Sequence, residues 1–224
     1  MSRRPFLLYS VAVVAAMLVV SAWAWVRLPA GGEIPIHWGM DGKANGFAPK
    51  ELGLLLVPGL ALLISGVFAA IPSLEPRRAN LEQSRTAYGL IWAAAITLMG
   101  GLHAVSVAVA LGAGLDVGQA VIGGIGLMWV LIGFALPRTR SNYLMGIRTP
   151  WTLTSERSWT ATHRLGGRLF VVLGLALLVA ALARLGGEVM LAIMLGGMAA
   201  VIVGLFAYSY VAWKADPDRT VTPR

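Results

Sequence analysis

Residues 142–168 read NYLMGIRTPWTLTSERSWTATHRLGGR and form the one long polar stretch between two extended apolar runs. The stretch begins at Asn142 and contains two tryptophans, a histidine, four arginines and a cluster of hydroxyl side chains. Most of the remaining chain consists of Leu, Val, Ala, Ile and Gly. A function confined to one place on this chain is therefore expected in this stretch or in the shorter polar segment 33–47.

The composition predicts an integral membrane protein. The 224 residues are 58% hydrophobic and only 12% charged, and the mean hydropathy is +0.76. Soluble domains are usually about 25% charged, so a water-soluble fold could not cover this much apolar surface.

Six apolar runs are long enough to cross the hydrocarbon core as helices, which requires about 20 residues. Continuous apolar runs favour helices over barrel strands, which alternate in polarity. We predict one all-α membrane domain, a bundle of about six transmembrane helices. Within it, an N-terminal helix pair (1–72) is followed by a middle pair (73–141) and by a last segment (142–224). The runs lie at 6–26, 52–71, 87–111, 119–136, 169–184 with an extension backwards, and 189–213.

The positions of the basic residues predict the topology. With the N-terminus inside, the outer segments carry only Arg27, Lys43, Lys50 and Arg184, and the inner segments carry the rest of the 18 basic residues. Inner loops are normally the basic ones, so we expect both termini and residues 142–168 in the cytoplasm. This pattern accounts for the net charge of +8, and no nucleic-acid binding is expected. The first run is longer than the about 7–15 residues of a cleavable signal and is predicted to be a retained span.

The absence of cysteine excludes disulfides, thiolate zinc sites and thiol nucleophiles. The last three helices are rich in glycine, which predicts close helix packing. The glycines concerned are Gly123, Gly124, Gly126, Gly166, Gly167, Gly174, Gly196 and Gly197.

The outer segment is predicted to be a compact hairpin. Ile34, Ile36 and Trp38 alternate with other residues, as in a short strand. Asp41-Gly42 and Asn45-Gly46 are turn dipeptides, because glycine accepts a positive φ without a Cβ clash. The alternative is a connector that only reverses the chain.

His103 is the one ionisable side chain deep in a predicted span. An ionisable group inside a membrane suggests function. A neutral histidine can also be structural, bonded to a neighbouring backbone group or to Ser106, and a proton relay would need a second titrating partner. We therefore favour the structural interpretation.

Within residues 142–168, Pro150 forces Thr149 into an extended conformation, and Thr154 or Ser155 can then cap a new helix. On that helix Trp159 and His163 share one face, and Arg157, Arg164 and Arg168 share another. Two interpretations stay open: an interfacial helix with tryptophans at the headgroups and arginines on lipid phosphate, or a docking surface for a partner.

Residues 146–170 resemble the signature of the SdpI family of bacterial membrane proteins, and the outer segment resembles the short domain of unknown function often found at the start of these proteins. The inner positions that carry the resemblance are Gly146, Arg148, Thr149, Pro150, Trp151, Thr152, Leu153, Trp159, Thr162, His163, Arg164 and Gly167. The outer positions are Pro35, His37, Trp38, Gly42, Gly46 and Phe47.

The resemblance implies a multi-pass protein of the bacterial inner membrane that makes cells immune to a secreted toxic peptide. It also implies a second role, in which the protein transduces a signal by holding a cytoplasmic repressor at the membrane. The expected partners are thus lipid, an extracellular toxic peptide and a cytoplasmic regulator, and no cofactor or metal is expected. His37, Trp38 and Phe47 would supply aromatic anchors for the peptide, and Arg157, Arg164 and Arg168 would meet acidic groups of the regulator. The full set of outer binding candidates is Pro35, His37, Trp38, Asp41, Gly42, Gly46 and Phe47. The inner candidates are Asn142, Gly146, Arg148, Thr149, Pro150, Trp151, Thr152, Trp159, His163, Arg164 and Arg168.

Two other classes of function stay open. A transporter or channel would need a polar lining, for which the spans offer little beyond Thr97, His103, Ser106, Gln119 and Tyr208. An intramembrane enzyme would need a catalytic group, and the best on offer is His163 with Ser158, Thr162 or Glu156. A metal outside could use His37 with Glu33 and Asp41.

Overall fold

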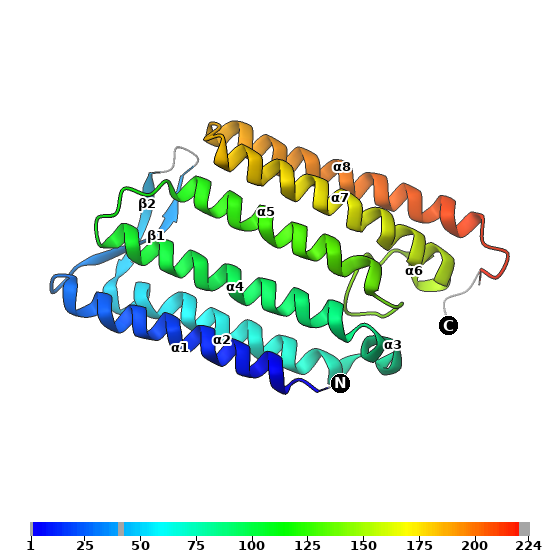
Figure 1. Ribbon diagram of the computed structural model, residues 1–224, viewed down its shortest axis with the longest axis horizontal. Helices are drawn as coiled ribbons and strands as arrows, with labels where there is room; N and C mark the ends of the chain where they lie inside the picture. The colour runs from blue at the N-terminus through cyan, green and yellow to red at the C-terminus, as the bar shows by residue number, and fades with distance from the viewer. Residues whose placement is uncertain (1, 40–42, 220–224) are drawn as a thin grey trace.

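The computed structural model describes residues 2–39 and 43–219 as a bundle of long helices with a two-stranded hairpin at one end (Figure 1). Six helices in this part of the chain are long and apolar enough to cross a membrane. This confirms the predicted all-α membrane fold with six candidate spans. They are α1 (Arg4–Arg27), α2 (Lys50–Leu74), α4 (Arg85–Ala110), α5 (Val117–Ala135), α7 (Glu156–Leu182) and α8 (Gly187–Lys214).

The connections hold the shorter elements. Strands β1 (Glu33–Trp38) and β2 (Ala44–Pro49) form an antiparallel hairpin between α1 and α2, so the predicted hairpin is confirmed. At the other end of the bundle lie α3 (Arg78–Gln83), a 3-10 turn η1 (Leu136–Arg138) and α6 (Pro150–Thr154).

The fifth span extends backwards as predicted and begins at Glu156. Ser155 precedes it in an extended conformation and accepts a hydrogen bond from the Ser158 N–H, which satisfies one of the unpaired donors of the first turn. Helix α7 therefore includes Arg157, Arg164 and Arg168, and the last part of the polar stretch belongs to a span.

Helices α1, α2 and α4 pack around a core of aromatic side chains. The Phe68 ring stacks on Trp92 with a centroid distance of 5.5 Å, and the Phe6 ring lies 5.8 Å from the same tryptophan. The Trp92 indole N–H donates to Ser10 Oγ at 3.0 Å. A buried tryptophan needs such a partner, and a serine on α1 supplies it.

Helices α5 and α7 meet through glycine. A Cβ on Gly174 would lie 2.5 Å from the Gly126 carbonyl oxygen, and a Cβ on Gly167 would lie 2.6 Å from that of Gly133. The two pairs lie about two turns apart on each helix, so the helices run antiparallel with their backbones in contact. The close packing predicted from glycine is confirmed here, whereas a Cβ on Gly196 in α8 would meet nothing within 4 Å.

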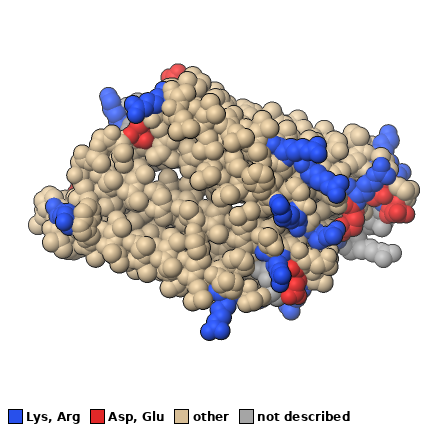
Figure 2. All heavy atoms as spheres, in the orientation of Figure 1, with Lys and Arg blue, Asp and Glu red and all other residues tan. Residues whose placement is uncertain are grey.

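On the face shown in Figure 2, most charged side chains lie towards the two ends of the bundle, and an uncharged band separates them. Helix α1 begins and α8 ends at the same end (Figure 1). This arrangement suits a membrane-spanning bundle. The side of the membrane that each end faces stays a prediction, as does the division into three segments. We refer below to the hairpin end as the outer end and to the opposite end as the inner end.

Candidate functional site

The outer hairpin is fastened to the helices beneath it. Ile34 on β1 is fully buried, and a Cβ on Gly53 of α2 would lie 2.6 Å from the Ile34 Cβ. Ser106 of α4 donates a hydrogen bond to the Pro35 carbonyl oxygen at 3.1 Å, and the Lys50 N–H donates to Gly32. The hairpin is thus a fixed part of the outer surface rather than a loose connector.

One of the two turns predicted for the hairpin, Asn45-Gly46, is not a turn. Asn45 and Gly46 lie within β2, where Gly46 pairs with His37 across an irregular register. A Cβ on Gly46 would come within 2.9 Å of the His37 Cβ, so the glycine is needed for close strand pairing and not for a turn. The other expected turn, Asp41-Gly42, lies outside the described residues.

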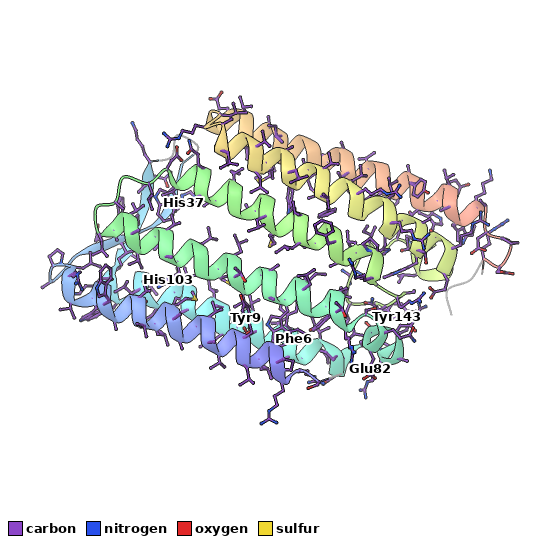
Figure 3. The ribbon with its side chains drawn as sticks, in the orientation of Figure 1. Phe6, Tyr9, His37, Glu82, His103 and Tyr143 are labelled. Carbon is purple, nitrogen blue, oxygen red and sulfur yellow. The ribbon has the colours of Figure 1, made fainter. Side chains whose placement is uncertain are left out.

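An outer pocket of about 330 Å³ opens between β1 and the first turns of α5 and α8. His37 and Trp38 line it from the strand, Val117 and Ile122 from α5, and Met190 from α8. The His37 Nδ1 lies 2.5 Å from Asn45 Oδ1, which can only accept, so Nδ1 carries the proton and Nε2 of the neutral ring is an acceptor. Figure 3 shows His37 beside the start of α5. The pocket is apolar with one oriented imidazole at its edge.

The predicted outer residues do not all belong to this pocket. Pro35 on β1 is buried, and Phe47 on β2 is exposed; neither lines the pocket. Gly46 has a structural role, and Asp41 and Gly42 lie outside the described residues. His37 and Trp38 are therefore the predicted side chains that the structure places in a cavity.

The inner end contains a buried polar network, which we call the inner network. Its centre is Glu75, which is 1% exposed and accepts hydrogen bonds from the backbone N–H groups of Tyr143 and Arg77. The Arg77 guanidinium donates to the Ser141 hydroxyl, to the Tyr143 hydroxyl and to the Leu153 carbonyl oxygen, and it lies over the Tyr143 ring. These bonds tie the segment after η1 to the end of α2 (Tyr143 is labelled in Figure 3).

His163 and Trp159 form the second part of the inner network. Their rings stack with centroids 4.0 Å apart, and both side chains are buried. The His163 Nε2 accepts the Ile147 N–H at 2.9 Å, and Nδ1 donates to the Trp159 carbonyl oxygen at 2.8 Å. Gly146, with a φ of +108°, lies against both rings, where a Cβ would come within 2.4 Å of the imidazole. The shared face of Trp159 and His163 was predicted correctly, but the tryptophan cannot reach lipid headgroups.

The Thr149-Pro150 turn and the end of α8 form the third part. Thr149 is extended, as predicted, and its hydroxyl accepts from the Thr152 N–H in a capping box that starts α6. The Thr149 hydroxyl also donates to Ser209 on α8. Further along, Ser155 donates to the buried Asp216 carboxylate at 2.5 Å. The inner network thus connects α2, α6, α7 and α8.

Burial divides the predicted inner candidates. Asn142, Thr149, Thr152, Trp159 and His163 are buried, and Gly146 and Trp151 are half-buried, with the Trp151 ring 4.7 Å from that of Phe206. Arg148, Pro150, Arg164 and Arg168 are exposed. A partner could therefore contact the arginines and Pro150, while the other side chains hold the surface in place. Sequence reasoning missed Glu75, Arg77, Ser141, Ser209 and Asp216.

His103 has the structural environment that we favoured. Its Nε2 lies 3.0 Å from Ser21 Oγ and 3.2 Å from the Met17 carbonyl oxygen, and Ser21 donates to the Leu54 carbonyl oxygen. The histidine on α4 thus joins α1 and α2 (Figure 3). The expected backbone partner is confirmed, but Ser106 is not a partner, because its hydroxyl bonds to Pro35.

The catalytic arrangement weighed for the inner end does not form. Both nitrogens of His163 are engaged with backbone groups, and the Ser158 hydroxyl donates to the Ser209 carbonyl oxygen. A general base must present a basic nitrogen to the proton it removes. His163 has none to present, because both of its nitrogens are held by backbone groups.

Two regions of the chain match known families. Residues 138–209 match the SdpI/YfhL protein family, and residues 12–62 match a domain of unknown function, DUF1648. The chain is also 25% identical, over 206 residues, to the "Immunity protein SdpI" of Bacillus subtilis (strain 168), a match that covers 90% of this chain and 93% of that protein. No solved structure matches the chain. The matched regions contain the outer hairpin and most of the inner network.

Proposed function

We propose that this chain, which matches the SdpI/YfhL family over residues 138–209 and DUF1648 over residues 12–62, is a membrane immunity protein that protects a bacterium from a secreted toxic peptide. The observation that carries the proposal is the similarity to an immunity protein over 90% of the chain. Both nitrogens of His163 and the Ser158 hydroxyl are engaged in hydrogen bonds, and this also favours binding over catalysis.

The outer pocket is the place where such a peptide would bind. Trp38 combines a large apolar ring with an indole N–H, and tryptophan is among the residues that contribute most to binding energy at interfaces. His37 adds an acceptor at the pocket edge. An apolar side chain of the peptide would enter between β1, α5 and α8, and a neighbouring donor would meet the imidazole.

A second role, in signalling, is supported by the exposed arginines of the inner end. Arg148 and Arg157 are exposed, and among the described residues neither has a carboxylate partner. The Arg148 guanidinium also donates to the Tyr143 carbonyl oxygen at 2.5 Å, which orients it on the inner network. An acidic face on a cytoplasmic regulator would complement these two side chains.

The test is the survival of a sensitive bacterium that expresses the protein and is challenged with toxic peptides from related producers. We expect the unchanged protein to protect. Cells that express Trp38→Ala should be killed by about thirtyfold less peptide, because a contact of this kind contributes about 2 kcal/mol. Phe47→Ala is the matched control, since Phe47 is an exposed aromatic residue of the same hairpin outside the pocket. Membrane levels of each variant would be compared by immunoblotting.

The outcomes separate the parts of the proposal. If Trp38→Ala protects as well as Phe47→Ala, the pocket does not bind the peptide. If Arg148→Ala keeps full protection but abolishes a transcriptional response to the peptide, the inner surface acts in signalling alone. Failure of the unchanged protein to protect against every peptide tested would contradict immunity as its function.

A further inference from the structure

A groove at the inner end lies between α5 and α7, outside the inner network. It has a volume of about 480 Å³ and is lined by Gly133, Phe134, Val171 and Val172 along its length and by Arg138, Arg164 and Arg168. The groove exists because Gly133 and Gly167 bring the two helix backbones together and leave no side chains to fill the space above them.

On both walls of the groove, the lining residues change from basic to apolar in the same direction. Helix α5 runs towards the inner end, so Gly133 and Phe134 lie deeper in the bundle than Arg138 in η1, the turn that follows α5. Helix α7 runs the opposite way, so Arg164 and Arg168 precede Val171 and Val172. Both walls are thus cationic towards the inner end and apolar towards the middle of the bundle.

The charge of the groove is not neutralised within the protein. Arg164 and Arg168 are exposed, and in residues 2–39 and 43–219 neither has a carboxylate partner. Arg138 donates one hydrogen bond to the Phe134 carbonyl oxygen and is otherwise exposed. Figure 2 shows basic side chains gathered over the inner parts of α5 and α7, with acidic side chains beside them nearer the tip of the bundle.

We propose that this groove binds one anionic phospholipid, with its phosphate between Arg164 and Arg168 and an acyl chain along Val171 and Val172. The order of the lining selects the ligand: a phosphate at the charged end with an apolar tail directed into the bundle matches a phospholipid, whereas a free phosphate would leave the apolar part empty. Arginine binds phosphate through its planar fork of donors, and the zwitterionic headgroup of phosphatidylcholine offers no net charge to these guanidiniums.

The experiment is native mass spectrometry of the full chain in a neutral detergent, titrated with phosphatidylglycerol or with phosphatidylcholine of the same acyl chains. We expect the first phosphatidylglycerol molecule to bind at least about fivefold more tightly than the first phosphatidylcholine molecule, since each basic residue near an anionic lipid contributes roughly that factor. Arg164→Gln with Arg168→Gln should remove this preference. Val172→Trp, at an exposed position, should weaken the first binding event for both lipids by filling the groove.

Arg157→Gln is the matched control, because Arg157 is an exposed arginine on the same helix that does not line the groove. If Arg157→Gln and the double variant lose the preference for phosphatidylglycerol to the same extent, the result would contradict a defined site and indicate diffuse attraction to anionic lipid. Equal binding of the two lipids to the unchanged protein would also overturn the proposal. Displacement of the bound lipid by an acidic peptide at lower concentration than by phosphatidylglycerol would assign the groove to a protein partner instead.

Discussion

At the scale of single residues, His163 shows how a polar side chain acquires a role from contacts that are distant in the fold. The spacing to Trp159 places both rings on one helix face, and this much can be read from the sequence. The decisive partner is the Ile147 N–H, which reaches the imidazole only because Gly146 adopts a positive φ before it. The histidine therefore connects α7 to the preceding loop, and its ring is held as a fixed neutral tautomer.

His163→Ala should destabilise the protein. The change leaves the half-buried Ile147 N–H without an acceptor, which costs about 1–3 kcal/mol, and it also removes the ring stacked on Trp159. The measurement is the temperature at which half of the detergent-solubilised protein aggregates. Arg157→Ala, on the same helix but exposed, should leave this temperature nearly unchanged. An equal temperature for His163→Ala and the unchanged protein would refute the structural role.

At the scale of elements, the sequence predicts helices well and their contacts less well. Six apolar runs are sufficient to place α1, α2, α4, α5, α7 and α8, because length and hydropathy determine what can cross a membrane. The contact faces are not encoded so directly. Gly174 and Gly196 lie in equally apolar surroundings, yet the first touches the backbone of α5 and the second faces open space.

Gly174→Val should therefore disrupt the contact between α5 and α7. Its Cβ would meet the Gly126 carbonyl oxygen at 2.5 Å and the Val130 N–H nitrogen at 2.8 Å, and these backbone atoms move only if the whole helix moves. Overpacking of this kind costs about 1–3 kcal/mol. The fraction of protein that stays monodisperse in size-exclusion chromatography after heating should fall for Gly174→Val and not for Gly196→Val. Similar losses in both variants would mean that valine is harmful in these helices regardless of contact.

The inner segment shows where sequence reasoning stops. The extended Thr149, the Ser155 cap and the start of a helix at Glu156 follow from local rules, since each depends on neighbouring residues. The bonds of the Tyr143 N–H to Glu75 and of the Ser155 hydroxyl to Asp216 do not, because these two carboxylates come from distant parts of the chain. A polar loop and a buried polar network have the same composition, and only the tertiary fold distinguishes them.

At the scale of the whole molecule, the two candidate binding regions lie at opposite ends of the bundle. The outer pocket is formed by β1, α5 and α8, and the inner network by α2, α6, α7 and α8. The proposed functions need these ends on opposite sides of a membrane, with the hairpin outside. The distribution of basic residues favours this orientation, and the even number of spans is consistent with both ends of the chain lying on one side.

The orientation can be tested directly because the chain has no cysteine of its own. Single changes to cysteine at four exposed alanines, Ala30 and Ala113 at the outer end and Ala79 and Ala215 at the inner end, would each provide one thiol. In spheroplasts, a membrane-impermeant maleimide should label Ala30→Cys and Ala113→Cys, and it should label the other two only after lysis. The reverse pattern would place the hairpin in the cytoplasm, where no secreted peptide could reach Trp38. Such a result would exclude the outer pocket as the site of immunity while leaving the helical fold and the lipid groove intact.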